Sequence, residues 1–263
     1  MTQSWRLLLH GARSAFDNMA IDEAILRCVV AGDSPNTLRF YTWEPSAVSV
    51  GYFQGLEQEV DLEACEREGV DVIRRLTGGG AVFHDRDGEI TYSLALKGNT
   101  PGDTPGDTPG IPQNVLESYG VLCRGLVLGL QCLGLEANFA PINDILVNGR
   151  KISGNAQTRR FGGILQHGTV LCDVNPALMF QLLKVPDAKM RDKLIQVVTE
   201  RVTSIRRELG KVEHDTVIQA LQAGFAEALA VDLVSGALSA QEEALAQQIK
   251  AERYATHEWL FKR

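Results

Sequence analysis

Three consecutive glycines, Gly78–Gly80, interrupt two stretches with strand character, Val70–Arg75 before them and Glu89–Leu96 after them. Glycine permits a positive φ and leaves room for a ligand beside the backbone, and successive N–H groups in such a turn can bind an anion. The stretch has no G-x-x-x-x-G-K-[ST] pattern, and a strand rather than a helix follows it, which excludes a P-loop and a dinucleotide-binding fingerprint. The sequence therefore predicts an anion-binding turn, with a tight bulged hairpin as the alternative.

The residues on either side of the glycines carry charge. Arg74 and Arg75 alternate across a strand, so at least one of them is expected on the ligand side, where arginine suits bidentate phosphate contact. His84 follows with Asp85 beside it. A lone histidine is more often structural than functional, and Asp85 either orients it or caps a turn.

A second group of polar residues surrounds a predicted hairpin. Asn148-Gly149 is typical of a two-residue type I′ turn within Asp144–Lys151. Lys151, at the mouth of this hairpin, can neutralise a carboxylate and an α-phosphate as they react, or it is simply a solvated charge. Asn143 or Asp144 offers the oxygen ligands that Mg²⁺ prefers.

A third feature is His167-Gly168, within the predicted strand Gly163–Val174. Glycine weakens a strand unless another group approaches the backbone closely. The pair therefore indicates close approach at this point.

Composition excludes several classes of protein. The net charge of −7 argues against broad nucleic-acid binding, although a local basic patch is compatible with it. The apolar stretches are shorter than the ~18 residues of a membrane span, and the N-terminus lacks a signal peptide's apolar region. Five cysteines without a C-x-x-C pair indicate reduced thiols, not a disulfide framework or a metal site, so we expect a cytoplasmic protein.

Strands with interspersed helices precede a helical C-terminal part, which predicts an α+β (mixed α/β) domain with a mixed sheet flanked by helices. We expect one domain over residues 1–263, with a mobile Gly/Pro-rich loop at 97–113 that contains the Gly-Asp-Thr-Pro repeat. The other predicted strands are Trp5–His10, Thr37–Trp43 and Ser46–Phe53, and the predicted helices are Ser14–Gly32, Asp61–Glu68, Asn114–Gly134, Glu213–Ala230 and Ser239–Ala255.

Three blocks of the sequence, in this order, carry a family resemblance: "RRLTGGGAVFHD", "NDILVNGRKISGNAQ" and "QHGTVL". They resemble the signature blocks of the lipoate–protein ligase and octanoyltransferase superfamily, relatives of the biotin ligases. "FDNMAIDEAIL", "LRFYTWEPSAVSVGYFQ", "LLKVPDAKMRDKL" and "YATHEWLFKR" resemble family segments too, so only the repeat falls outside the resemblance. It implies a biotin/lipoate protein ligase-type catalytic domain. Biotin is the poorer match, because biotin ligases carry a G-R-G-R-x-G type loop in place of "TGGGAV".

The resemblance implies a lipoate–protein ligase that activates lipoate with ATP and Mg²⁺ as lipoyl-AMP and passes the lipoyl group to a lysine of a lipoyl-accepting domain. Lys151 would be the catalytic residue, and Asn143 and Asp144 the metal ligands. The implied substrate and nucleotide contacts are Arg75, Gly78, Gly79, Gly80, His84, Asn143, Lys151, Gly154, His167 and Gly168. Acceptor domains in this superfamily are generally acidic, which makes Arg159-Arg160 and Lys184–Lys193 candidate docking charges. Many ligases carry a C-terminal accessory domain that is absent here, which implies a separate accessory subunit or a variant that acts alone.

Two alternatives remain. The first is an octanoyl- or lipoyl-transferase that acts from an acylated carrier protein through a cysteine thioester. The relevant relatives place that cysteine in the loop matching Asn138–Asn143 or in the region matching "LLKVPDAKM", and neither contains one here. Cys132 and Cys172 are expected in the core. The second alternative is an inactive paralogue that binds lipoate.

Overall fold

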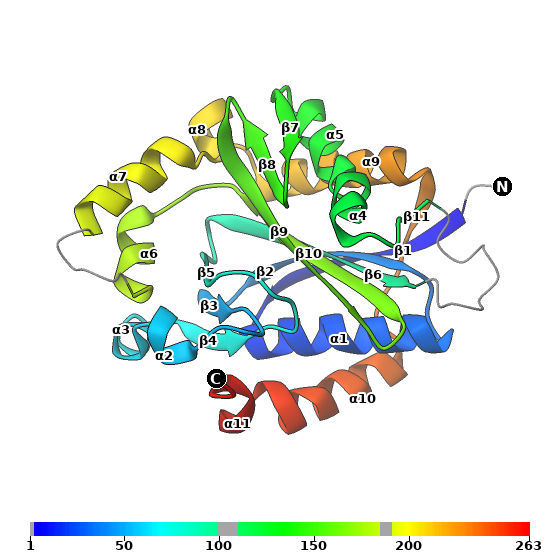
Figure 1. Ribbon diagram of the computed structural model, residues 1–263. Helices are drawn as coiled ribbons and strands as arrows, with labels where there is room; N and C mark the ends of the chain where they lie inside the picture. The colour runs from blue at the N-terminus through cyan, green and yellow to red at the C-terminus, as the bar shows by residue number, and fades with distance from the viewer. Residues whose placement is uncertain (1–2, 99–109, 185–190) are drawn as a thin grey trace.

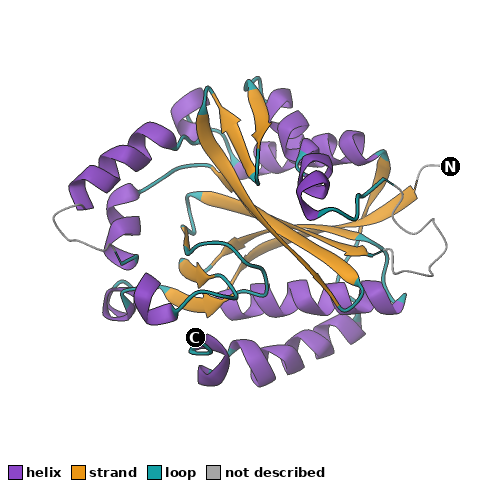
Figure 2. Cartoon of the chain, viewed as in Figure 1, coloured by secondary structure: helices purple, strands orange, loops and turns teal. Residues whose placement is uncertain are grey.

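The computed structural model describes residues 3–98, 110–184 and 191–263, and the side chains of residues 191 and 192 lie outside the description. An eight-stranded sheet forms the centre of the molecule (Figures 1 and 2). Its strands, in spatial order, are β11 (Val231–Ser235), β1 (Gln3–Arg13), β2 (Thr37–Trp43), β6 (Glu89–Lys97), β10 (Gly163–Leu171), β9 (Arg150–Arg160), β8 (Asp144–Val147) and β7 (Ala137–Ala140). The Gly-Asp-Thr-Pro repeat lies outside the described residues, so the expected loop at 97–113 stays a prediction.

The sheet is mixed. Strand β1 pairs in parallel with both β2 and β11, whereas every pair from β2 to β7 is antiparallel. Helices cover both of its faces. The prediction of an α+β domain built on a mixed sheet is therefore confirmed.

A second, three-stranded sheet lies beside the first. Its order is β4 (Asp71–Arg74), β3 (Ala47–Val50) and β5 (Val82–His84), with β3 parallel to β4 and antiparallel to β5. The glycine stretch joins β4 to β5, which lie on opposite edges of β3. It is therefore a crossing loop over the end of β3, and the alternative of a bulged hairpin is wrong.

One face of the large sheet is covered by α1 (Ala15–Ala31), which packs against α10 (Ala240–Ile249) and its π-helical continuation η2 (Lys250–Tyr254). The sequence predicts α1 closely. The Ser14 side chain accepts a hydrogen bond from the Asp17 N–H, and Gly32 ends the helix in the left-handed region with φ 85°. Figure 1 shows α1 and α10 lying side by side beneath the sheet.

The other face is covered by α4 (Val115–Leu122), α5 (Arg124–Cys132) and α9 (His214–Leu229). The helix predicted over Asn114–Gly134 is present, but it is divided into α4 and α5 at one residue, Cys123. Gly125 and Gly129 do not simply weaken the helix. An added β-carbon would lie 2.2 Å from the Phe225 ring at Gly125 and 2.7 Å from Leu221 Cα at Gly129, so both glycines allow α5 to pack closely on α9.

The remaining helices are α2 (Leu56–Glu59), α3 (Leu62–Arg67), α6 (Pro176–Leu182), α7 (Arg191–Arg201), α8 (Ile205–Leu209) and α11 (His257–Leu260). The expectation that no apolar stretch reaches the length of a membrane span is wrong for Val115–Cys132, which is long and apolar enough by length and composition alone. Here it forms α4 and α5 of the helical layer, and the core helix of a soluble protein passes the same test.

Candidate active site

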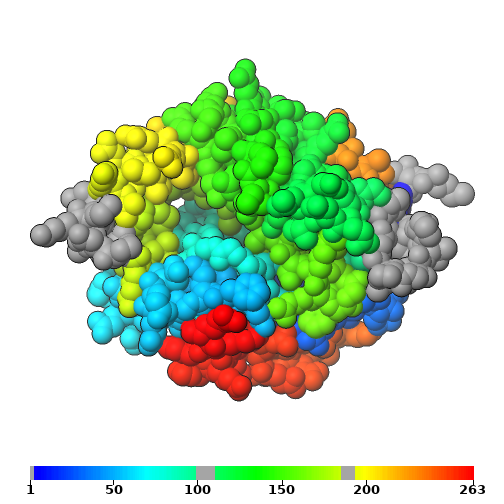
Figure 3. All heavy atoms as spheres, in the orientation of Figure 1, coloured from blue at the N-terminus to red at the C-terminus, as the bar shows by residue number. Residues whose placement is uncertain are grey.

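A cavity of about 400 Å³ opens between the two sheets and α6 and α7. Figure 3 shows the hollow on the surface, between the yellow, cyan and green segments. Among the described residues, Met19 is the only residue of α1 that lines the cavity. Its apolar walls include Met19, Trp43, Val82, Phe83, Leu171, Met179, Val198 and Val202. A mostly apolar pocket with a few convergent polar groups is typical of a small-molecule site.

The glycine loop forms one edge of this cavity, and Gly79 and Gly80 line it. Gly79 has φ 95°, and an added β-carbon would lie 2.9 Å from the Arg75 guanidinium. At Gly80 nothing lies within 4 Å of an added β-carbon, and at Gly78 only Phe53 does, at 4.0 Å. The fold of the loop itself therefore requires glycine at Gly79, whereas at Gly80 the open space faces the cavity.

Arg75 holds the glycine loop in place. Its Nη2 donates to the carbonyls of Gly78 and Gly80, both at 2.7 Å, and its Nη1 donates to the Ser49 carbonyl and hydroxyl, both at 3.0 Å. Every one of these acceptors is neutral. Burial lowers the pKa of Arg75 to about 10, so the guanidinium is charged at neutral pH. Arg75 thus lies at the cavity as the sequence predicts, but its guanidinium binds the carbonyls of the glycine loop. Its buried positive charge remains beside this loop.

Arg74 faces away from the cavity, as strand alternation requires. Its guanidinium donates to the carbonyls of Gly51 and Gln54 on one side and of Leu260 on the other. It ties the C-terminal segment to the loop after β3. Gly51 is part of the same packing, because an added β-carbon there would lie 2.1 Å from the Gly79 carbonyl oxygen.

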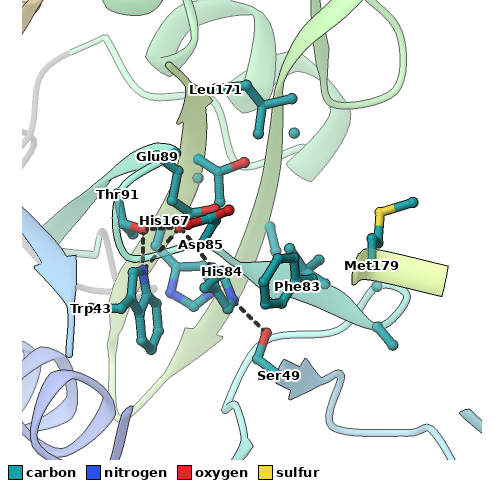
Figure 4. A pocket seen from close by; sticks show the side chains of 18 of the residues that line it. Trp43, Ser49, Phe83, His84, Asp85, Glu89, Thr91, His167, Leu171 and Met179 are labelled. Carbon is teal, nitrogen blue, oxygen red and sulfur yellow. Dashed lines mark hydrogen bonds and ion pairs between the residues drawn. The ribbon is translucent and has the colours of Figure 1, made fainter. Parts of the chain in front are cut away.

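His84 lies between a hydroxyl and a carboxylate (Figure 4). Its Nε2 is 2.8 Å from Ser49 Oγ, its Nδ1 is 2.7 Å from Glu89 Oε1, and its ring stacks on Trp43 at 4.1 Å. Glu89 therefore orients this histidine. Asp85 instead accepts a hydrogen bond from the Asp87 N–H and caps the turn, which is one of the two roles expected from the sequence.

His167 is fixed from the opposite wall. Its Nε2 is 2.7 Å from Thr77 Oγ1, and its Nδ1 is 3.8 Å from Asp22 Oδ2. Asp22 is held by Arg39 at 2.7 Å, and although burial opposes ionisation, this guanidinium keeps the pKa of Asp22 below its usual value. Burial lowers the pKa of His167, so the ring is neutral at neutral pH. Both histidines line the cavity as polar groups held by hydrogen bonds.

Lys151 reaches the cavity from the start of β9. Its Nζ lies 2.7 Å from Asp144 Oδ1, and both side chains are partly exposed. Two features of the predicted hairpin are confirmed: Asn148 and Gly149 have φ values of 51° and 73°, as a type I′ turn requires. At Gly154 an added β-carbon would lie 2.9 Å from Lys151 Cε and Nζ, so this glycine leaves the space that the lysine occupies.

Asn143 is fixed by Asn155 on the neighbouring strand. The Asn155 side chain donates to the Asn143 carbonyl at 2.9 Å, and the Asn143 side chain donates to the Asn155 carbonyl. The Asn155 amide also accepts from the Tyr92 hydroxyl at 2.7 Å. An added β-carbon at Gly168 would lie 2.1 Å from Asn155 Oδ1, which confirms the close approach predicted at Gly168 and identifies the approaching group.

A divalent cation would have two protein oxygens here. The Asp144 carboxylate has Oδ1 paired with Lys151, and its Oδ2 has no protein partner among the residues described. Asn143 lines the cavity beside it. Within that same part of the chain, no group of three His, Cys, Asp or Glu side chains could hold a metal. The set fits Mg²⁺, which uses one or two protein oxygens together with substrate phosphates and water.

Most of the predicted site residues come together. Those that line the cavity are Arg75, Gly79, Gly80, His84, Asn143, Lys151, Gly154, His167 and Gly168, whereas Gly78 and Asp144 lie just outside it. Sequence reasoning missed Asp22, Ser49, Glu89 and Asn155. Of these four residues, only Asn155 had a local signal, because it follows Gly154 in one of the polar segments that the sequence singles out. The other three come from distant segments of the chain.

None of the five cysteines, all of which are described, lines the cavity. Cys172 is buried as expected, and burial raises its pKa to about 12. The expectation that Cys132 lies in the core is wrong, because it is exposed at the end of α5. Burial also raises the pKa of the thiols of Cys28, Cys65 and Cys123.

The comparisons with curated proteins point to transferases. The chain is 40% identical over 99% of its length to the whole of a protein named Octanoyltransferase LipM from Kyrpidia tusciae. It is 35% identical to the protein of the same name from Brevibacillus brevis, over 99% of this chain and all of that protein. These names fit the transferase alternative better than the ligase that the sequence predicts.

Among solved structures the similarity is to ligases. A bi-partite lipoate protein ligase from Thermoplasma acidophilum, described with its E2 lipoyl domain, superposes with a TM-score of 0.87 at 33% identity, over 98% of this chain and 96% of that one. A lipoate-protein ligase A bound with ATP gives a TM-score of 0.80 at 30% identity, over 99% of each chain. Residues 14–226 match the family model described as the lipoyl protein ligase A/B catalytic domain. The chain belongs to this family of lipoate–protein ligases and octanoyltransferases.

Proposed function

We propose that this chain transfers a lipoyl or octanoyl group to a lysine of a lipoyl-domain protein, by a route in which no cysteine of the chain carries the acyl group. The observation that carries the proposal is the lining of the cavity, which includes Lys151 and none of the five cysteines. An acyl-cysteine route needs a thiolate aimed at the acyl carbonyl. Burial raises the pKa of four of the five thiols, and the fifth, Cys132, is away from the cavity.

The apolar walls between Met19, Phe83 and Met179 suit the hydrocarbon part of the acyl group. Lys151 lies at the polar end, where its ammonium stabilises the negative charge that develops on the acyl carboxylate and its leaving group. The open side of Gly80 leaves room for that leaving group against the backbone. The acceptor lysine, as its neutral amine, then attacks the activated carbonyl. The C–N bond forms, the bond to the leaving group breaks, and the nitrogen releases a proton to solvent.

The first form of the proposal is the ligase, in which ATP activates the acid as acyl-AMP. It is supported by the position of Lys151 in the cavity lining and by the fold shared with a ligase bound with ATP. Asn143 and Asp144 would hold Mg²⁺, which supplies charge neutralisation to the phosphates. The bi-partite description of the Thermoplasma ligase supports a separate accessory subunit for this chain too.

The second form is octanoyl transfer, which the names of the full-length relatives favour. The donor would be an acyl thioester on a carrier protein, and the acceptor lysine would attack that thioester directly in the cavity. Lys151 would have the same role in both forms, because each reaction builds negative charge on the same carbonyl.

The experiment offers the purified chain each donor separately, lipoate or octanoate with ATP and Mg²⁺, or an octanoylated carrier protein, with an isolated lipoyl domain as acceptor. Acyl-AMP and pyrophosphate in the first reaction support the ligase, and acylated domain in the second supports the transferase. A variant with all five cysteines replaced by serine or alanine should keep its activity in whichever reaction proceeds. Loss of transfer with retained folding would overturn the cysteine-free route.

A further inference from the structure

Outside the cavity, three cations gather around two aromatic rings. We call this group the cationic rim and define it as Tyr52, Phe53, Arg160, Lys262 and Arg263. The Arg160 guanidinium lies 4.3 Å from the Tyr52 ring centre and Lys262 Nζ lies 4.2 Å from it, while the Arg263 guanidinium lies 5.6 Å from the Phe53 ring centre. Lys262 also donates to the Tyr52 hydroxyl at 2.5 Å.

None of the residues that the structure describes neutralises the charges of the rim. No described carboxylate lies within ion-pair distance of Arg160, Lys262 or Arg263, although the chain as a whole carries a net charge of −7. Hydrogen bonds from Lys262 and Arg160 lower the pKa of Tyr52 to about 8, which reflects the same unbalanced positive potential. The rim therefore attracts an anionic group from outside.

The composition of the rim is typical of a protein-binding surface. Phe53 is 66% exposed, and an exposed aromatic ring flanked by arginine is the composition that protein interfaces favour. None of the five residues lines the cavity, so the rim is separate from the expected nucleotide contacts. Figure 3 shows the red C-terminal segment beside the blue residues that follow β3, on the face where the hollow opens.

The rim contacts the glycine loop directly. The Tyr52 N–H donates to the Thr77 carbonyl at 2.9 Å, and the Phe53 ring lies over Gly78, while the next two glycines line the cavity. A lysine side chain is only a four-carbon stem. An acceptor lysine that enters the cavity must therefore bring its surrounding protein surface onto the residues at the mouth.

From these observations, and resting on the proposed function, we propose that an acidic surface around the target lysine of the acceptor protein docks on the cationic rim. Arg160 is one of the two docking arginines that the sequence suggests. Arg159 differs, because its guanidinium is bound to the Pro112 carbonyl at 2.7 Å. In the other candidate segment, Lys184 donates to the Glu57 carbonyl and residues 185–190 lie outside the described chain.

The test is a charge reversal, Arg160→Glu with Lys262→Glu, assayed with two acceptors: an isolated lipoyl domain and a short peptide in which one lysine is the only charged side chain. The matched control is Arg67→Glu with Lys211→Glu, which makes the same change in net charge at exposed sites on α3 and beyond α8. We expect the KM for the lipoyl domain to rise roughly tenfold in the rim variant only. The rate with the peptide should not change, and the wild-type KM should rise with salt.

Equal KM values for the lipoyl domain in the rim variant and the control variant would overturn the docking surface, as would an equal loss of activity with the peptide that has no acidic residue. If the wild-type chain acylates neither acceptor from any donor, the proposed function fails and the docking surface fails with it. Circular dichroism of both double variants checks that they are folded.

Discussion

The β-carbon that Gly154 lacks would lie 2.9 Å from Lys151 Nζ. Carbon atoms do not approach an ammonium so closely without displacement, so Gly154→Ala should push the lysine from its position beside Asp144. We expect acyl transfer to slow roughly tenfold, since a small misplacement of a reacting group is costly. Gly120→Ala is the matched control, because an added β-carbon there has nothing within 4 Å. Equal rates for the two variants would show that Lys151 does not need this space.

Lys151→Ala tests the lysine itself. Loss of one preorganised charge at a developing anion costs roughly 10²–10³-fold in rate, and that is the fall we expect in acyl activation and transfer. The fold should persist, because the side chain is 40% exposed. The measurements are pyrophosphate release and acylated lipoyl domain, with Lys211→Ala, at another exposed lysine, as the control. Wild-type rates in Lys151→Ala would contradict the role.

Gly79 and Gly80 should respond differently to alanine. Gly79 has φ 95° and faces Arg75, so Gly79→Ala should lower the free energy of unfolding by about 1–2 kcal/mol. Gly80 has no such constraint, so Gly80→Ala should leave stability almost unchanged and weaken binding of the activated acyl group in the cavity. Urea denaturation and calorimetric titration measure the two effects. A loss of stability in Gly80→Ala without one in Gly79→Ala would contradict the two roles, in which Gly79 allows the conformation of the loop and Gly80 leaves space for the ligand.

Stability should fall in mild acid, and His10 contributes to the fall. Burial and the charge of Arg39 lower the pKa of His10 to about 4, and the imidazole Nδ1 accepts from Arg39 Nε at 2.8 Å. The unfolded chain takes up this proton below the ordinary pKa of about 6.5 and the folded chain does not. Stability is therefore full above that pH and is lost as the pH falls toward 4.

The expected loss from His10, allowing for solvent screening of a partly exposed ring, is on the order of 1 kcal/mol between about pH 7 and about pH 5. Urea denaturation at both pH values measures it. His10→Gln keeps an acceptor for Arg39 and cannot titrate, so its stability should depend less steeply on pH. An identical pH dependence in the variant and the wild type would show that His10 does not contribute.

Local signals predicted much of the fold. Ser14 and Gly32 mark the ends of α1, and Asn148-Gly149 fixes the hairpin before Lys151, because caps and two-residue turns depend on residues close in sequence. The division of the predicted helix at Cys123 and the short strand β11 were not predictable in this way. The parallel pairing of β11 with β1 is made across most of the chain, and no local pattern encodes such a partner.

The site shows the same division. Arg75, Lys151 and His167 line the cavity as predicted. They could be predicted because each lies in a short segment whose residues suggest its chemistry. Glu89 and Asp22 were missed, although they position the two histidines. Glu89 lies on β6 and Asp22 lies on α1, and only the packing of these elements brings each carboxylate to its histidine. The sequence around a carboxylate in a strand or a helix does not indicate which distant residue it contacts.

Intact-protein mass spectrometry of the wild-type chain tests the central proposal most directly. The chain is incubated with each acyl donor, with lipoyl domain omitted, and then denatured. We predict that the denatured chain has its unmodified mass, and that acyl-AMP or unreacted acyl carrier is recovered from the solution. An acyl adduct on the chain, mapped to Cys132, Cys172 or any other cysteine, would contradict a route without an acyl-cysteine.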